Sequence, residues 1–319
     1  MSGDDRPISK AVIFGLAGLS VSDDERRFFA DADPFGFILF ARNCDTPEQI
    51  RALVADLREI IGRPDAPVLI DQEGGRVARL RPPHWREAPP AAVFGALAAQ
   101  NDEAAVEATR LNAQLIGGEL AALGIDVDCA PVLDIPAPGS HEIVGDRAFG
   151  DAPALVARLG RAAVEGFLAA GVIPVIKHIP GHGRAKVDSH HDLPVVEVYE
   201  AIDPDNPATT SKAAITDIIR GEIGFDGVLV SDDLSMKALS GSLGERAAAA
   251  LAAGCDIALH CNGEMDEMRA VAETASPLST EAIARTARAR AQISAEHSLA
   301  EHVDVAALTA QLRALLDAA

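Results

Sequence analysis

The stretch from residue 176 to residue 194 concentrates side chains that can transfer protons. It reads IKHIPGHGRAKVDSHHDLP and holds four of the nine histidines of the chain. Because imidazole titrates near neutral pH, His190 can act both as a general acid and as a general base. Asp188, two positions earlier, can orient that ring and stabilise its cation. A pair of this kind needs only a separate carboxylate to support glycoside hydrolysis in two steps.

A candidate for that carboxylate follows the apolar stretch 227–230, in the sequence Ser231-Asp232-Asp233. Neighbouring residues on a strand face opposite ways, so only one of the two aspartates should point into a shared site. The other can cap the following turn. With His190 as the proton donor, the one of Asp232 and Asp233 that faces the site completes the set of groups that a glycosidase requires.

Two other chemistries fit the histidine-rich stretch less well. His178 and His182 have the i, i+4 spacing of zinc ligands on a helix, but the Pro-Gly-His-Gly turn at 180–183 excludes a helix there. The same glycines and Lys186 have the character of a phosphate loop, yet no helix begins directly after them. The sequence therefore predicts neither a metal nor another cofactor.

The composition limits the partners of the chain. The formal net charge is -20 over 319 residues, whereas nucleic-acid binding needs clustered basic side chains, so no such partner is expected. No apolar run reaches the ~20 residues that cross a bilayer, so no membrane partner is expected either. The apolar stretch 11–19 lacks a small-residue cleavage motif. We expect a cytoplasmic monomer with reduced cysteines at Cys44, Cys129, Cys255 and Cys261.

Apolar, β-branched stretches alternate with helical patterns along the whole chain. Strands are expected at 11–17, 35–40, 67–70, 125–133, 172–176, 227–230 and 257–260. Helices are expected after Ser22 and at 47–61, 102–123, 153–170, 211–222, 244–253, 280–296 and 305–316. This alternation predicts an α/β fold with a parallel sheet, and the length favours a (β/α)₈ TIM barrel formed as a single domain, 1–319.

The polar clusters all follow expected strands, which places the site at the C-terminal ends of the strands. Loop hydrogen bonding alone is a weaker explanation for three such clusters than for one. Local signals also mark helix starts. Ser22 is expected to cap one helix, Thr46 and Gln49 to form a capping box at a second, and Asp151 to cap a third.

At this point the motifs resemble those of a known family. The stretch 177–183, followed by Asp188-Ser189-His190, is similar to the signature of bacterial β-N-acetylglucosaminidases of glycoside hydrolase family 3, the NagZ type. The stretch 227–232 resembles the nucleophile strand of that family. The stretches 71–76 and 145–147 resemble its sugar-binding loops, and the similarity extends from about Ala11 to His260.

The resemblance implies roles for individual residues. Asp232 matches the nucleophile that forms a covalent glycosyl-enzyme, His190 the acid/base, and Asp188 its partner. The positions that match residues holding the N-acetylglucosamine unit are Asp71, Arg79, Arg147, Lys177 and His178. The implied activity is removal of terminal N-acetylglucosamine from 1,6-anhydro-muropeptides during cytoplasmic peptidoglycan recycling, without a cofactor.

One departure from the family pattern concerns the segment after Val198. Members of this type have a further helix and strand there, whereas here Tyr199 to Pro204 already resembles the sequence that follows that strand. About 30 residues, one βα unit, are therefore missing, and seven strands rather than eight are expected. Because barrel closure couples strand number to stagger, this loss threatens the distance between His190 and Asp232. A family 3 β-glucosidase and a catalytically crippled sugar-binding member remain as alternatives.

Overall fold

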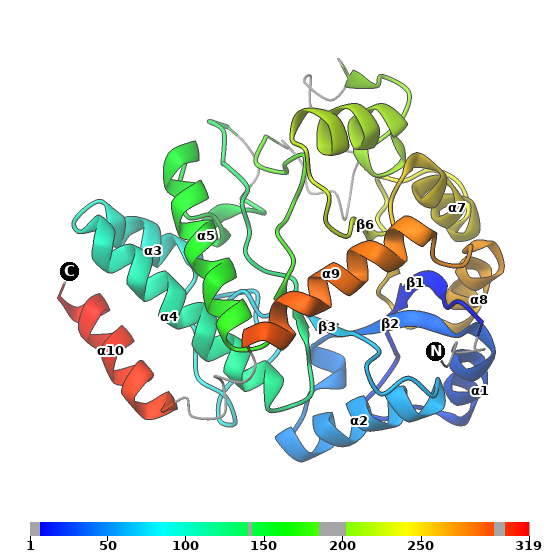
Figure 1. Cartoon of the computed structure of the whole chain (residues 1–319), viewed down its shortest axis with the longest axis horizontal. Coiled ribbons are helices and arrows are strands. Elements are labelled where there is room, and N and C mark those ends of the chain that lie inside the picture. The colour runs from blue at the N-terminus through cyan, green and yellow to red at the C-terminus, as the bar shows by residue number, and fades with distance from the viewer. Residues whose placement is uncertain (1–6, 140–141, 185–201, 297–303, 319) are drawn as a thin grey trace.

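A single parallel sheet organises the molecule (Figure 1). The computed structural model describes residues 7–139, 142–184, 202–296 and 304–318. Seven strands within these ranges lie in the order β5-β4-β3-β2-β1-β7-β6. Their bounds are β1 Lys10–Phe14, β2 Pro34–Leu39, β3 Val68–Ile70, β4 Val127–Asp128, β5 Ile173–Pro174, β6 Val230–Asp233 and β7 Ile257–His260.

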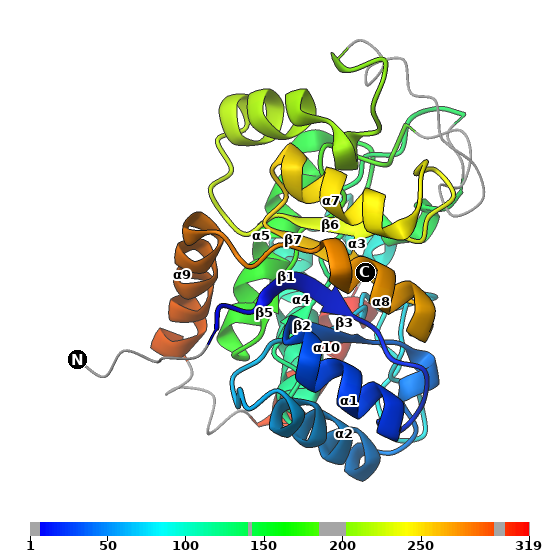
Figure 2. The ribbon, with the colours of Figure 1, turned by 90° about the vertical axis from the view of Figure 1, so that its right-hand side faces the viewer.

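Helices connect successive strands and cover the outer face of the sheet (Figures 1 and 2). The α-helices are α1 Asp23–Ala32, α2 Pro47–Ile60, α3 Ala91–Ala98, α4 Asp102–Ala121, α5 Pro153–Ala169, α7 Leu243–Ala253, α8 Met265–Thr274, α9 Thr280–Glu296 and α10 Val305–Asp317. A π-helix, η4, spans Ala214–Glu222. Short 3₁₀ turns are η1 Ala41–Asn43, η2 Gly145–Arg147 and η3 Ala208–Thr210. In the part of the chain that is described, no helix is long and apolar enough to cross a membrane.

The helix starts follow the local sequence in two cases of three. Ser22 forms a complete capping box with Glu25 at α1. Thr46 accepts from the Gln49 backbone at α2, but the Gln49 side chain binds the Asp45 backbone instead of returning to Thr46. The expected cap by Asp151 is wrong: α5 starts at Pro153 with Ala152 at the N-cap position and no side-chain cap. Proline at the first turn already lacks one of the donors that a cap would satisfy.

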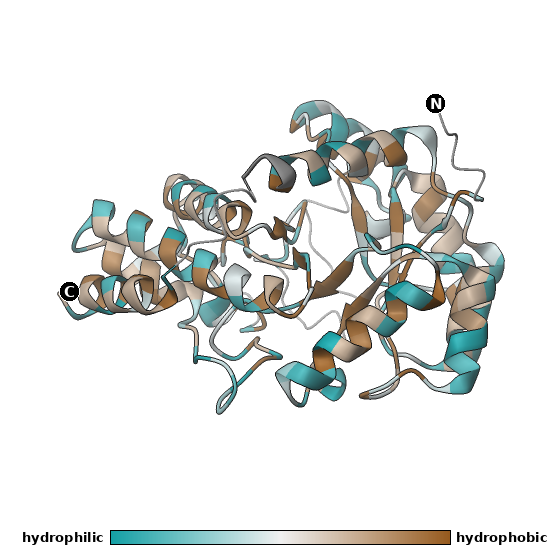
Figure 3. Ribbon diagram, turned by 60° about the horizontal axis from the view of Figure 1, so that its bottom comes forward, coloured by the Kyte–Doolittle hydropathy of each residue, from teal (hydrophilic) through white to brown (hydrophobic). Residues whose placement is uncertain are grey.

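Alternation along the strands builds two apolar layers. Ile13, Ile38 and Leu69 face the inner side of the sheet and pack together. Phe14, Phe37 and their alternating neighbours face the helices instead. The hydropathy colours in Figure 3 show the same division, with apolar strands inside and polar outer helix faces. Helix α9 closes the amino-terminal end of the inner layer, where Leu278 and Ala282 join it.

The sheet curls like part of a TIM barrel but does not form eight strands within the described residues. The expected count of seven strands is confirmed, and all six strand pairings are parallel. No strand lies between Pro174 and Val230 in 175–184 or 202–229, apart from one isolated bridge from Lys177 to Val132. The curved sheet is therefore a half-barrel whose edge strands are β5 and β6.

Four strands differ from the sequence prediction by more than one residue at either end: β1 and β5 are shorter than the expected 11–17 and 172–176, and β4 and β6 differ as follows. The strand expected at 125–133 is reduced to two residues, because Pro131 has no N–H to donate to the ladder. The strand expected at 227–230 lies three residues later. Before it, the Leu229 N–H donates to the Asp256 carboxylate at 2.9 Å, and Arg220 binds the carbonyl of Gly227 at 2.7 Å. The Leu229 N–H and the Gly227 carbonyl are thus bound to side chains, whereas in a strand they would pair with the neighbouring strand.

Candidate active site

Buried ion pairs join the carboxyl ends of β3 and β5. The Lys177 ammonium lies 2.8 Å from Asp71 Oδ1 and 2.6 Å from Glu73 Oε1. Arg79 donates to the other oxygen of Asp71 at 2.9 Å. The Arg79 guanidinium also lies 5.2 Å from the centre of the Phe40 ring, which restricts it from a second side. The structure thus brings together three residues that the sequence assigned to the site.

Arg147 joins the same cluster from η2. Its Nε and Nη2 atoms donate to the two oxygens of Glu73, both at 2.8 Å. This two-bond geometry fixes the plane of the guanidinium more strictly than a single contact does. We refer below to Asp71, Glu73, Arg79, Arg147 and Lys177 as the ion-pair cluster. The sequence prediction omitted Glu73, although it lies in the stretch 71–76 that was recognised as a sugar-binding loop.

The loop after β3 is folded back so that Arg79 reaches Asp71. The Gln72 carboxamide accepts from the Arg79 N–H at 2.8 Å and from the Leu80 N–H at 3.0 Å. Gly74 permits the turn because its φ is +99° and an added Cβ would lie 2.4 Å from the Pro89 carbonyl oxygen. The backbone conformation, and not only the side chains, therefore determines this part of the site.

The charges of the cluster are strongly coupled. Burial would raise the pKa of Asp71, but Lys177 and Arg79 lower this pKa to about 2. Burial would lower the pKa of Lys177, but Asp71 and Glu73 raise it above its ordinary value. Both partners are consequently charged at neutral pH, and the donors of the two cations are fixed in direction.

Asp128 lies beneath the cluster at the end of β4 and is completely buried. Its Oδ1 accepts from the Gln72 N–H at 3.0 Å, while Oδ2 has no partner among the described residues. Burial, with the nearby carboxylates of Asp71 and Glu73 acting in the same direction, raises the pKa of Asp128 to about 8. A neutral Asp128 leaves the ion-pair cluster with three cations and two carboxylates, a surplus of donors that suits hydroxyl and amide oxygens.

Two histidines of the 176–183 loop lie beside the cluster. His178 Nδ1 is 2.6 Å from Asp134 Oδ2, and the other oxygen of Asp134 accepts from the His182 backbone N–H. The two imidazole rings are 5.5 Å apart, centre to centre. Burial and the neighbouring His178 lower the pKa of His182. Asp134 and His182 were not among the predicted site residues; the position of Asp134 directly after the strand expected at 125–133 is the signal that could have indicated it.

The two aspartates of β6 behave differently from each other. Asp233 Oδ1 accepts from the Ser235 N–H at 3.1 Å and from the Cys261 N–H at 3.2 Å, so Asp233 caps the turn as one of the pair was expected to do. Among the described residues, Asp232 Oδ1 accepts from the N–H of Asp233 alone, at 2.8 Å. The register of β6 against β7 shifts between Val230 and Asp233, so regular alternation along the strand is interrupted at these aspartates.

Asp232 and the ion-pair cluster share one end of the sheet, because Asp71 directly follows β3, Asp232 lies near the end of β6, and all strands are parallel. Burial raises the pKa of the Cys261 thiol, and the carboxylates of Asp233, Asp71 and Asp232 all act in the same direction on it. The charge of Asp232 also acts on His182, whose pKa it shifts upward against the effect of burial. The two catalytic candidates His190 and Asp188 lie outside the described residues.

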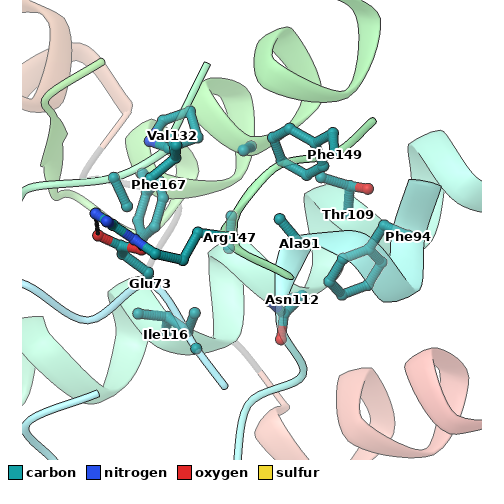
Figure 4. Close-up of a pocket in the computed structure, with 15 residues that line it drawn as sticks. Glu73, Ala91, Phe94, Thr109, Asn112, Ile116, Val132, Arg147, Phe149 and Phe167 are labelled. Carbon is teal, nitrogen blue, oxygen red and sulfur yellow. Dashed lines mark hydrogen bonds and ion pairs between the residues drawn. The ribbon is translucent and has the colours of Figure 1, made fainter. Parts of the chain in front are cut away.

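A cavity of about 40 Å³ adjoins the Glu73–Arg147 pair (Figure 4). Apart from that pair, its lining is mainly apolar and includes Phe94, Ile116 and Phe167. Such a volume holds on the order of two or three water molecules and is too small for a sugar ring. The cavity therefore lies between the Glu73–Arg147 pair and helices α3, α4 and α5, and is not the sugar site itself. Within the ranges that the structure describes, no three His, Cys, Asp or Glu side chains are arranged to hold a metal ion.

Comparison with protein families gives a match along most of the chain. The model described as the N-terminal domain of glycosyl hydrolase family 3 matches residues 13–201 and 197–293. The two matched stretches overlap at 197–201, the region where the sequence analysis expects a βα unit to be missing.

Individual relatives agree with the family match. A protein of Aromatoleum aromaticum described as a beta-hexosaminidase is 37% identical over 289 residues, which are 81% of this chain and 80% of that protein. A protein of Alkalilimnicola ehrlichii with the same description is 39% identical over 286 residues, 79% of this chain and 80% of that protein. The crystal structure of NagZ from Neisseria gonorrhoeae in complex with N-trifluoroacetyl-D-glucosamine has a TM-score of 0.83 and 28% identity, and covers 97% of this chain and 98% of that one.

Proposed function

The chain belongs to glycosyl hydrolase family 3, and on that premise we propose that this β-hexosaminidase is a retaining, exo-acting β-N-acetylglucosaminidase of the cytoplasm. Its proposed substrates are 1,6-anhydro-muropeptides, from which it releases terminal N-acetylglucosamine during peptidoglycan recycling. We further propose that it acts as a monomer and uses no cofactor.

The ion-pair cluster is the observation that carries this proposal. Lys177, Arg79 and Arg147 present directed donors within a buried network, while Asp71 offers carboxylate oxygens to sugar hydroxyls. The NagZ structure, with its N-acyl-glucosamine ligand, supports a site of this kind in a similar fold. In our proposal these four residues and His178 hold the amino sugar in the terminal position.

In the proposed chemistry Asp232 attacks the anomeric carbon while His190 donates a proton to the leaving oxygen. Asp188 orients the imidazole and stabilises its charged form. In the second step His190 removes a proton from water, which attacks the anomeric carbon and restores the Asp232 carboxylate. Two inversions give net retention of configuration.

Hydrolysis of aryl glycosides tests the assignment of activity. The wild-type protein is expected to hydrolyse an aryl β-N-acetylglucosaminide, with the β-anomer of the sugar as the first product by NMR. Asp232→Ala should lose on the order of 10³-fold or more in kcat, because no covalent intermediate can form. Asp217→Asn, on the exposed side of η4, is the matched control and should retain activity. Equal rates for wild type and Asp232→Ala would remove Asp232 from the mechanism.

The identity of the sugar is tested separately. If the aryl β-glucoside is hydrolysed with a higher kcat/KM than the N-acetylglucosaminide, the chain is a β-glucosidase of the same family. Release of N-acetylglucosamine from purified 1,6-anhydro-muropeptide tests the natural substrate.

A non-catalytic sugar-binding protein is a second candidate, and the open edge between β5 and β6 is the observation that favours it. The opening lies between β5, which precedes Lys177 and the histidine loop, and β6, which carries Asp232, so it separates the sugar-holding residues from the proposed nucleophile. Binding of N-acetylglucosamine by calorimetry without turnover of any aryl glycoside would support this candidate over the enzyme.

A further inference from the structure

Asp134 is a buried carboxylate to which the proposed mechanism gives no role. Its side chain is 0% exposed, although it lies at the end of the sheet that carries the site. One oxygen is 2.6 Å from His178 Nδ1, and the other accepts the backbone N–H of His182. The Asp134 side chain thus contacts both histidines of this loop, His178 at its ring and His182 at its backbone N–H.

The backbone on either side of Asp134 also contacts the 177–183 loop, through hydrogen bonds before Asp134 and through close packing after it. The Leu133 N–H donates to the Lys177 carbonyl at 2.6 Å, and the Lys177 N–H donates to the Pro131 carbonyl at 3.1 Å. Gly183 packs so closely that an added Cβ would lie 2.0 Å from the Ile135 carbonyl oxygen. Asp134 therefore lies within the contacts between residues 131–135 and 177–183, and these contacts position Lys177 beside the other members of the ion-pair cluster.

The chemistry of the contact determines which nitrogen of His178 carries the proton. Burial would raise the pKa of Asp134, but the hydrogen bonds from His178 and the His182 backbone lower it, so Asp134 is ionised at neutral pH. An ionised carboxylate only accepts hydrogen bonds. His178 Nδ1 must consequently be the protonated nitrogen, and in the neutral ring Nε2 is then an acceptor.

We propose that Asp134 is a positioning residue that holds His178 in the Nδ1–H form, so that Nε2 accepts a hydrogen bond from a sugar hydroxyl. This role rests on the proposed function, because it takes His178 to contact the sugar. His178 remains 25% exposed while Asp134 is sealed, so the ring is open to a ligand on the side away from the carboxylate. Carboxylates that orient histidines in this way are well known around metal ions, where their loss reduces affinity by about 10- to 100-fold.

The isosteric variant Asp134→Asn gives a sharp test of the tautomer. If the amide oxygen keeps the His182 N–H, the amide nitrogen faces His178 and donates to Nδ1. The proton of His178 then moves to Nε2, and the ring changes from an acceptor to a donor toward the sugar. Nitrogen-15 NMR of the imidazole at pH 8 should show Nδ1 protonated in the wild type and Nε2 protonated in the variant. A wild-type His178 that is protonated at Nε2 would overturn the proposal whether or not the protein is an enzyme.

A double-mutant cycle tests whether Asp134 acts through His178. Asp134→Asn is expected to raise KM for the aryl N-acetylglucosaminide by about 10-fold or more, with a smaller change in kcat. In a His178→Gln background the same substitution should change KM less than about 3-fold, because its target is gone. An equal effect in both backgrounds overturns the positioning role. Asp151→Asn, whose side chain is exposed and caps no helix, is the control and should match the wild type.

The failures of the two proposals are distinguishable. Absence of turnover by wild-type protein counts against the enzymatic function alone, since the NMR measurement on His178 needs no activity. Should Asp134→Asn fail to fold, the wild-type tautomer still decides the proposal.

Discussion

The carboxylates at the ends of β3 and β6 are held in opposite ways. Asp71 is bound by two cations at 2.8 and 2.9 Å, and both cations have further partners in the cluster or against Phe40. Within the part of the chain that the structure describes, the Asp232 carboxylate accepts a single hydrogen bond, from the N–H of the next residue. β3 lies in the interior of the sheet, whereas β6 is an edge strand with a bulge.

This difference separates binding from reaction in the proposed enzyme. A group that orients a substrate gains from a rigid network, because its donors need no rearrangement when the ligand arrives. A nucleophile must instead keep its oxygens free of strong partners, so that they remain available for bond formation. If the chain is instead the non-catalytic sugar-binding protein, we expect hydrolysis to be lost through a displaced Asp232 on β6, while the ion-pair cluster still binds the sugar.

Removing a cation from the ion-pair cluster should have the largest effect on stability. Lys177→Met removes the cation shared by Asp71 and Glu73 and leaves two buried carboxylates short of a partner. The expected loss is about 3–5 kcal/mol in the free energy of unfolding, measured by urea denaturation at pH 7. Arg27→Met, which removes only a surface pair with Asp24, is the comparison and should change stability by less than about 1 kcal/mol. Similar losses for both variants would contradict the comparison.

Asp128, beneath the ion-pair cluster, should make the free energy of unfolding depend on pH. Its folded pKa of about 8 lies above the ordinary value of 3.8 for a free aspartate, so its stabilising effect is full below the unfolded pKa and is lost as pH rises through the folded pKa. Between pH 5 and 7 the wild type should lose about 1.4 kcal/mol per pH unit relative to Asp128→Asn. Asparagine imitates the neutral acid, so the difference between the two unfolding curves isolates this group. Parallel curves would show that Asp128 is ionised.

Asp71 should show the reverse dependence. Its folded pKa is lowered to about 2, so its stabilising effect is present above the unfolded pKa of 3.8 and is lost as pH falls through the folded value. Asp71→Asn is expected to cost about 2 kcal/mol at pH 7, and the difference from wild type should shrink toward zero between pH 4 and pH 2. Thermal unfolding over this range provides the measurement. A constant difference would place the loss in packing and not in charge.

The smallest effect on stability is expected at the loosely held carboxylate. Asp232→Ala should change the free energy of unfolding by no more than about 0.5 kcal/mol, since the carboxylate accepts one local hydrogen bond from the described residues. The same variant carries the largest expected loss of kcat. A loss of stability close to that of Lys177→Met would mean that Asp232 has strong partners, and the contrast between the two regions would fail.

Much of the fold followed from the sequence because its signals are local. The strands at β2, β3 and β7 were predicted within one residue of their bounds, since each is a continuous apolar run, whereas β1 ends three residues earlier than predicted. Helix α3 was missed because every residue in its sequence, AAVFGALA, is apolar or small and so shows no periodicity. The displacement of β6 had no local signal, since it depends on Asp256 and Arg220.

The candidate site was predicted in part. Five sugar-holding residues were named from the motifs, and four of them form the ion-pair cluster with Glu73, which was not named. His178 was named without its partner Asp134, because that pair joins residues 44 positions apart. The roles of Asp232, His190 and Asp188 stay predictions.

The sequence by itself determined which stretches become strands and that polar residues follow them, because these properties depend on neighbours along the chain. Only the tertiary structure decided that Lys177 reaches Asp71 across 106 positions, that Asp134 holds His178, and that the sheet ends at β5 and β6. Such contacts depend on the order of strands in space. Strand order is set by packing of the whole sheet, which no local pattern records.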